Sequence, residues 1–261
     1  MIDNLKRVGF FNNRKKRSIR LLFPIALPFV VLIATPKLVS QTHPQFGGGG
    51  QIMIPTADFG GSVADFYSGV RYGQSVGIGI NVKTRFDLEG VPLAATMEYS
   101  ILRNKGMAEL GEIELEHRIF SLKLGPEVFL TLGGPFTGYI SANIALNNLG
   151  GDVTFKRIST LPDTAFIMRS GERLGFGLTS GVLVELYPAA NLDISLNYNF
   201  INPLNHVWED SNPDKDQRLD SYISINDAKD PEFSANDQKH FIPNARSIQT
   251  LQLTITLIFK I

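Results

Sequence analysis

Few side chains suited to catalysis occur in this 261-residue chain, which has four histidines and no cysteine. The lack of cysteine excludes disulfides, zinc–thiolate sites and thiol nucleophiles. His117 follows Glu116, but neighbouring side chains of a strand point to opposite faces, so these two do not form a base with its orienting carboxylate. His206 and His240 lie in a polar segment, and no Gly-x-Ser-x-Gly elbow is present. We therefore expect no enzymatic activity and no catalytic residue.

A second chemical candidate is the segment Asp210-Ser-Asn212-Pro-Asp214-Lys-Asp216, which alternates oxygen ligands as calcium loops do. The position that calcium loops reserve for glycine is Lys215, and the position of their bidentate glutamate is Ser221. Aspartate and asparagine are also common in any solvated loop. Calcium binding here stays open, and we assign neither a metal nor a cofactor.

The remaining candidates are charged side chains at alternate positions of otherwise apolar segments. They are Arg71, Lys83, Arg85, Glu98, Lys123, Glu127, Glu185, Asp193 and Lys260. The last stretch of the chain gives the clearest example, because every second residue from Leu251 to Ile261 is apolar and mainly polar residues from Thr250 to Lys260 alternate with them. A period of two is typical of a β-strand with one apolar and one polar face.

Eight segments carry this period. They are residues 46–55, 69–86, 93–102, 109–132, 139–148, 173–187, 192–200 and 247–261. In the fourth, the apolar phase slips near Phe120–Ser121, which we interpret as a β-bulge. A turn that splits this segment into two strands is the alternative.

The connections between these segments alternate in length. Short turns at 88–92, 133–138 and 187–191 alternate with longer connections at 55–68, 103–109, 149–171 and 202–246. If the mature N-terminus is periplasmic, every short turn falls on the periplasmic side, as in outer-membrane barrels. The sequence therefore predicts an all-β fold, an eight-stranded antiparallel up-and-down transmembrane β-barrel, closed because an open edge in lipid would leave backbone groups unpaired.

In this barrel the apolar faces meet lipid and the nine charged side chains named above point into the lumen. Charges of both signs can pair there, whereas on the lipid face each would cost several kcal/mol near the midplane. An eight-stranded barrel is narrow enough for side chains to fill it. Lumen-side glycines such as Gly177 and Gly181 leave a narrow water path as the alternative.

Residues 1–40 have the composition of a signal peptide. Five basic residues between Arg14 and Arg20 precede the apolar run Leu21–Ala34, which is too short for a comfortable transmembrane helix. We expect cleavage after Ser40, with Ala34 as the alternative and an uncleaved signal anchor as the other interpretation. Residues 41–261 keep 17 basic and 24 acidic side chains of the chain's 25 and 25, a net charge of −7. That balance argues against a nucleic-acid partner.

The opening FGGGGQIMIPTADFGG, followed by GVRYGQSVGIGINVKTRF, resembles the start of the OmpX-like and opacity-protein-like family of small outer-membrane β-barrels. The resemblance covers roughly residues 44–261 and carries the P-x-x-D-F-G loop and the glycine-alternating second strand. It implies an integral protein of the bacterial outer membrane. Barrels of this kind present a terminal strand to the barrel insertion machinery; here that strand ends Phe259-Lys-Ile261 rather than on the aromatic residue.

We expect a structural protein that presents surface loops for adhesion or binding, with long loops at 149–171 and 202–246. The expected partners are outer-membrane lipid and the barrel insertion machinery; we expect a monomer, and the extracellular partner is not identified. A narrow porin-like channel for small solutes and a lipid-A-modifying enzyme are the alternatives. A further alternative is a soluble periplasmic barrel with its apolar faces turned inward.

Overall fold

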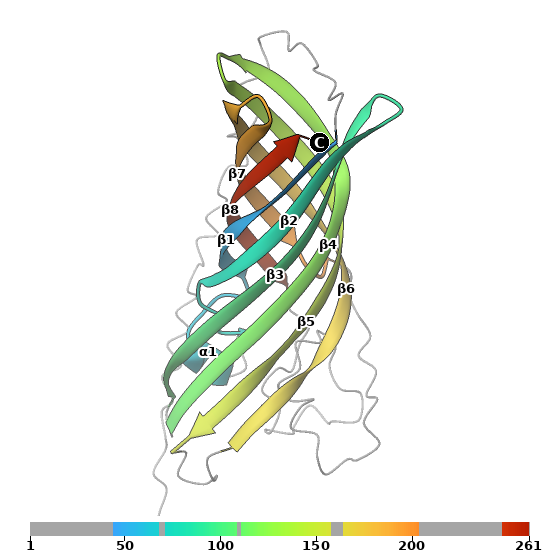
Figure 1. Cartoon of the computed structure of the whole chain (residues 1–261). Helices are drawn as coiled ribbons and strands as arrows, with labels where there is room; N and C mark the ends of the chain where they lie inside the picture. Colours follow the sequence, from blue (N-terminus) through green and yellow to red (C-terminus); the bar gives the residue numbers. More distant parts are fainter. Residues whose placement is uncertain (1–43, 68–70, 109–110, 158–163, 204–246, 261) are drawn as a thin grey trace, which may run out of the picture. The chain divides into compact units, whose positions relative to one another are not determined.

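The chain folds into a closed antiparallel β-barrel of eight strands, as predicted (Figure 1). The computed structural model describes residues 44–67, 71–108, 111–157, 164–203 and 247–260. The strands are β1 (Gln45–Ala57), β2 (Gly77–Leu88), β3 (Val91–Ala108), β4 (Gly111–Gly133), β5 (Phe136–Lys156), β6 (Thr164–Tyr187), β7 (Ala190–Phe200) and β8 (Ile248–Lys260). One short helix, α1 (Val63–Tyr67), lies between β1 and β2. No helix in the described ranges has the length and apolarity needed to cross a membrane.

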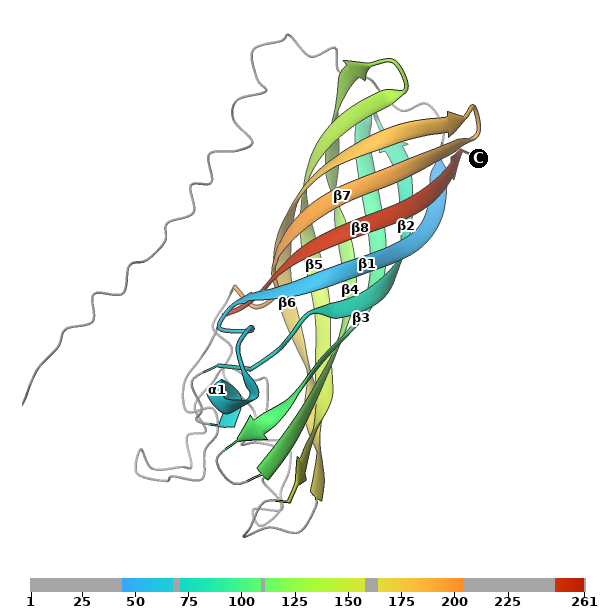
Figure 2. The same ribbon diagram turned by 90° about the vertical axis from the view of Figure 1, so that its left-hand side faces the viewer.

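The first and last strands close the barrel. Strand β1 pairs with β8 from Gln45↔Lys260 to Ala57↔Ile248, and Figure 2 shows the two strands side by side. The inner face of β1 requires glycine, because a Cβ at Gly47 or Gly49 would lie about 2 Å from a β8 carbonyl oxygen. The glycine run near the start of β1 therefore permits the close approach of the two strands.

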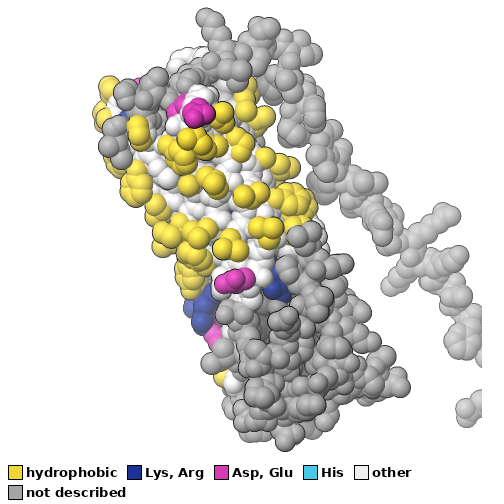
Figure 3. All heavy atoms as spheres, turned by 90° about the vertical axis from the view of Figure 1, so that its right-hand side faces the viewer, with side chains coloured by type: hydrophobic (Ala, Val, Ile, Leu, Met, Phe, Trp, Pro, Cys, Tyr) yellow, Lys and Arg dark blue, Asp and Glu magenta, His cyan; other side chains and the backbone are white. Residues whose placement is uncertain are grey.

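The outside of the barrel carries an apolar belt, and Figure 3 shows one face of it. Its large exposed side chains include Ile52, Ile54, Ile78, Ile80, Met97, Leu122, Leu124, Val128, Ile140, Ile144, Leu174, Leu178, Leu196, Leu253, Ile255 and Leu257. Aromatic cross-strand partners mark both edges, with Phe46 opposite Phe259 at one and Tyr99 opposite Phe120 at the other. A soluble protein does not expose apolar surface on this scale, whereas a membrane barrel carries such a belt between aromatic girdles. The apolar faces are therefore on the lipid side, as predicted.

Strand β4 runs without the predicted bulge. Its inner positions are buried from Gly111 to Phe129 with no change of phase, and its pairing with β3 is regular throughout. The prediction was wrong because the polarity of the two faces reverses while the geometry does not. From Phe120 toward the C-terminal end of β4, the outer face is apolar and the inner face polar. Before Phe120 the order is reversed, so that residues such as Glu114 point outward and Leu115 points inward.

The same reversal explains why two of the predicted connections are strands. Strand β3 extends to Ala108, and β5 and β6 occupy most of the predicted loop 149–171. Leu149, Val153 and Phe155 are buried there while Asp152 and its outer-face neighbours are more exposed, so the segment looks polar in sequence although it is a strand with an apolar inner face. Strands β3 to β6 thus continue beyond the lipid belt.

The second strand is shorter than predicted, because it begins at Gly77 and not at residue 69. The preceding segment folds inward: Tyr72 is fully buried, and Gly73 adopts a φ of 67°, a conformation that interrupts an extended chain. Arg71 is consequently exposed and lies outside the strands, so its predicted place in the lumen was wrong.

Residues 1–43 and 204–246 lie outside the described residues. The signal peptide with its two cleavage positions, the segment Asp210–Asp216, and nearly all of the predicted loop 202–246 therefore stay predictions.

The lipid belt makes a direct prediction about Ile255, which lies midway along the outer apolar face of β8 and is about half exposed. We expect Ile255→Arg to lower the free energy of unfolding in lipid vesicles by about 2–4 kcal/mol, because a charge at the bilayer midplane is poorly solvated. Denaturant titration in vesicles measures the change. Leu88→Arg, at the edge of the belt, is the matched control and should cost about 0–1 kcal/mol. Equal losses in the two variants would contradict the assigned position of the belt.

Candidate functional site

The predicted lumen charges converge in a compact cluster near the end of the barrel that carries the short turns. Lys83 Nζ lies 2.8 Å from Glu127 Oε1 and 3.0 Å from Asp193 Oδ2. Arg85 contacts the same two carboxylates and donates to Asp193 at 2.8 Å. The Tyr139 hydroxyl donates to Asp193 Oδ1 at 2.7 Å and accepts from Lys83 at 3.2 Å. We call these five residues the charge cluster.

The charge cluster is almost completely removed from solvent. The charged side chains are 1–9% exposed, and two positive charges face two negative ones. The Arg85 guanidinium also lies 4.8 Å from the centre of the Tyr139 ring. Buried ions require this kind of mutual satisfaction, because an unpaired buried charge costs several kcal/mol. The cluster therefore joins β2, β4, β5 and β7 across the lumen.

A second ion pair lies beside the charge cluster. Lys123 Nζ is 2.8 Å from Glu98 and 2.9 Å from the side-chain oxygen of Asn199, and all three side chains are buried. Elsewhere in the lumen, side-chain amides and hydroxyls bridge the strands. They are Gln51, Asn81, Ser100, Ser121, Asn147, Asn197, Thr250, Gln252, Thr254 and Thr256.

The glycines of the inner face leave space that side chains occupy. A Cβ at Gly181 would lie 2.5 Å from the Tyr139 ring, and one at Gly177 would lie 2.9 Å from Asn143 and from Asn199. A hollow of about 30 Å³ lies between the charge cluster and the second ion pair. That volume holds one or two water molecules.

Six of the nine predicted lumen residues belong to the charge cluster or to the second ion pair. Two more, Glu185 and Lys260, share the inner-face phase but lie at the rim, where their charged atoms are 3.5 Å apart and partly exposed. Arg71 is the exception described above. Tyr139 was read only as a strand residue in sequence, since a tyrosine in an alternating strand carries no sign of its ionic partners.

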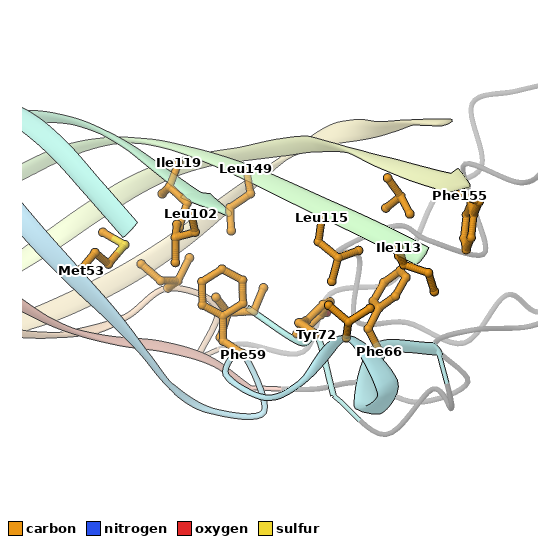
Figure 4. Packing of buried hydrophobic residues seen from close by; sticks show 14 residues of the cluster. Met53, Phe59, Phe66, Tyr72, Leu102, Ile113, Leu115, Ile119, Leu149 and Phe155 are labelled. Carbon is orange, nitrogen blue, oxygen red and sulfur yellow. The ribbon is translucent and has the colours of Figure 1, made fainter. Parts of the chain in front are cut away.

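Beyond the lipid belt, the interior of the barrel is an apolar core (Figure 4). The segment between β1 and β2 folds into this end of the barrel and contributes Phe59, Phe66 and Tyr72, which pack against Leu102 and Leu115 of the wall. Asn104 fastens the segment, because its side-chain amide donates to the carbonyl oxygens of Gly73 and Gly61 at 2.6 and 3.2 Å. The extramembrane part of the barrel is thus packed like a soluble protein.

His117 lies in this apolar core, with its ring 5.7 Å from the ring of Phe59 and 6.4 Å from that of Tyr72. Neither ring nitrogen has a hydrogen-bond partner among the described residues. It lies beyond the lipid belt, since its neighbours Glu116 and Arg118 are charged and face outward. Burial lowers the pKa of the imidazole to about 3. His117 is therefore a neutral packing residue in an apolar environment.

On its outer face, the extramembrane sheet carries cross-strand ion pairs. Arg103 and Arg118 both contact Glu116 at 2.7 Å, Lys105 contacts Glu112 at 2.9 Å, and Lys156 contacts Glu114 at 3.4 Å. Arg118 also pairs with Asp152. We call these residues the ion ladder. Part of the ion ladder lies in segments that were predicted to be connections. The even-numbered outer face of β4, which runs without a break from Glu112 to Leu132, is the signal that would have identified it.

Comparison with known proteins gives structural likeness only. No protein-family model and no curated protein matches the sequence. Neisserial surface protein A has 11% identity to this chain and a TM-score of 0.48, with 84% of this chain and 97% of that protein covered. OprG, an outer-membrane protein of Pseudomonas aeruginosa, has 13% identity and a TM-score of 0.42, with 87% and 98% covered. Ail, the attachment invasion locus protein of Yersinia pestis, has 10% identity and a TM-score of 0.41, with 85% of this chain and 100% of that protein covered.

The closed sheet, its lipid belt and its polar interior show that the chain folds as a small eight-stranded transmembrane β-barrel. The predicted lack of enzymatic activity stays a prediction. Of the four histidines, the structure describes only His117, and its surroundings are apolar.

The charge cluster predicts a large stability effect for Glu127→Gln. Removing this charge leaves Lys83 and Arg85 to share Asp193, so we expect a loss of about 3–5 kcal/mol in the free energy of unfolding, as for other broken buried pairs. Denaturant titration in vesicles gives the value. Glu114→Gln removes one carboxylate from an exposed pair of the ion ladder and should cost less than about 1 kcal/mol. If Glu127→Gln cost no more than this control, the cluster would not stabilise the barrel.

His117 predicts a specific pH dependence. The unfolded state takes up a proton on His117 below its ordinary pKa of 6.5, whereas the folded state does not until pH approaches 3. Stability is therefore lost as pH falls, and this group alone should cost about 2 kcal/mol between pH 7.5 and pH 5. We expect His117→Leu to remove this part of the pH dependence while the barrel folds normally. An unchanged pH dependence in this variant would contradict the burial of a neutral imidazole.

Proposed function

We propose that this protein is a non-conducting outer-membrane anchor that presents an ordered, charged sheet outside the membrane for adhesion or binding. The observation that carries the proposal is the reversal of polarity along β3, β4 and β5, which makes the part of each strand beyond the lipid belt a wall with a charged outer face and an apolar inner face. Loops and edges held on a rigid scaffold commonly carry binding functions.

Two features of the interior support a lumen that does not conduct. The charge cluster bridges four strands across the barrel, and the apolar core lies beyond it toward the outer end. A solute would have to displace paired buried charges and then cross a packed apolar region, and each step is costly. The alternative of a narrow channel has no observation of its own in its favour.

The ion ladder supports the binding part of the proposal. Its residues alternate in sign across β3, β4 and β5. The basic side chains are 40–68% exposed and their carboxylate partners 20–43%, so the pairs add little to the stability of the fold. An exposed array of fixed charges favours encounter with a complementary surface and contributes specificity. Burial of the inner face of the same strands holds the array in place.

The proposal predicts two results for bacterial cells that gain this protein. Uptake of a small hydrophilic dye should not rise, because the lumen is filled. Attachment to an array of immobilised proteins and glycans should rise, and the triple variant Arg103→Gln, Glu114→Gln, Glu116→Gln should lose more than about half of that gain, because complementary charges drive the contact. Glu89→Gln, in the short turn at the opposite end, is the matched control and should change neither result.

Stepwise conductance of the purified protein in planar bilayers, with dye uptake above that of control cells, would contradict the filled lumen. Attachment equal to that of cells lacking the protein would contradict the binding role.

A further inference from the structure

The barrel wall has a lateral opening at the extracellular edge of the lipid belt. Strand β2 begins at Gly77, which pairs with Met53 and with Leu102. Its neighbours extend further, β1 to Ala57 and β3 to Ala108, and among the described residues no strand lies between their ends. The segment before β2, which includes α1, packs across this gap. A groove of about 610 Å³ remains there, within the range of small-ligand sites.

The groove continues the lipid-facing surface of the barrel. Ile54 and Val76 line it, and both are exposed, at 41% and 54%. On the outer face, Ile54 follows Ile52 of the belt and Val76 precedes Ile78. A molecule in the belt's lipid layer can therefore enter the groove sideways without crossing water, and Val63 and Ala64 of α1 provide further apolar lining.

The groove also contains a buried amide side chain, one atom of which has no partner among the described residues. Gln74 lines it and is 2% exposed. Its amide nitrogen donates to the carbonyl oxygen of Tyr72 at 3.4 Å. That oxygen, Oε1, has no hydrogen-bond partner among the described residues. A buried acceptor left unsatisfied costs about 1–3 kcal/mol, so a ligand that supplies a donor gains affinity there.

A cation lies at the polar side of the groove. Lys105 lines it, with a side chain that is 57% exposed and paired with Glu112 at 2.9 Å. Exposed pairs of this kind contribute little stability, so the ammonium group is free to exchange Glu112 for a phosphate. The groove is also preformed. The side-chain amide of Asn104 on β3 donates to the backbone of Gly61 and Gly73, and Ser62 and Asp65 form reciprocal hydrogen bonds at the start of α1.

We propose that this groove binds the acyl chain of an anionic membrane lipid from the adjoining leaflet, and that it selects a chain carrying a hydroxyl group near the headgroup. The apolar lining takes the chain, Gln74 Oε1 accepts the hydroxyl hydrogen, and Lys105 pairs with the headgroup phosphate. The site is separate from the charge cluster. Lys105 and Glu112 also belong to the ion ladder, but the triple variant that tests attachment changes neither of them, so failure of one test is distinguishable from failure of the other.

The test measures lipid binding to the full-length protein in detergent micelles by native mass spectrometry. The two probes are a phosphatidic acid with a 3-hydroxymyristoyl chain and the same lipid with a myristoyl chain. We expect the wild type to bind the hydroxylated lipid about tenfold more tightly, a difference of about 1.4 kcal/mol. Gln74→Leu, which removes the unsatisfied oxygen at similar volume, should bring the preference below about twofold while the barrel folds.

A second variant tests the place of binding. Ala64→Trp fills the groove and should weaken binding of both lipids more than tenfold, whereas Ile144→Trp, on the lipid belt away from the groove, should leave binding unchanged. Heat-modifiable migration on a gel confirms that each variant is folded.

Three results would overturn the proposal. Equal affinity of the wild type for the two lipids would exclude selection by Gln74. Binding that survives Ala64→Trp would place the lipid on the belt instead. Tight binding of free 3-hydroxymyristic acid, with no binding of the phosphatidic acid, would assign the groove to a soluble amphiphile and not to a membrane lipid.

Discussion

The structure depends on one constraint: the wall of a single closed sheet must face lipid at one height and water at another while it encloses a packed interior. Backbone hydrogen bonds are satisfied by closure of the sheet, with β1 held close to β8 by the glycines at 47 and 49. Side chains are then selected by what surrounds the wall. Where lipid is outside, the inside is polar and charges pair; where water is outside, the inside is apolar.

This constraint gives the barrel two different cores in series. The charge cluster has little hydrophobic burial to rely on, since lipid already solvates the outer apolar side chains, and it is held by complementary ions and aromatic rings. The extramembrane core around Phe59, Tyr72 and Leu115 is stabilised by removing apolar surface from water, as in soluble proteins. One consequence is that paired charges occupy the lumen at one height and apolar side chains occupy it at another. Another is that the outer ion ladder is held on a rigid support.

The fold could be predicted from sequence because a period of two survives in every strand and because a closed sheet is what lipid permits. The charge cluster followed from the same period, since Lys83, Glu127 and Asp193 share the inner phase of their strands. The failures have one physical origin. A period shows which residues share a face, but it does not show what surrounds that face, so the reversal at Phe120 looked like a bulge and the buried run from Leu149 to Phe155 looked like a loop. Arg71 was misplaced because an inward fold at Tyr72 and Gly73 leaves no periodic signal.

The reversal of polarity along β4 is the central claim, and a cysteine-free chain allows it to be measured directly. Single cysteines at positions 112, 114, 116, 118, 120, 122 and 124, spin-labelled in vesicles, report their access to oxygen in lipid and to a water-soluble nickel chelate. The account predicts access to the chelate from 112 to 118 and to oxygen from 120 to 124, with the change between Arg118 and Phe120. Oxygen access that continued through 112, or that was lost at 120–124, would contradict it.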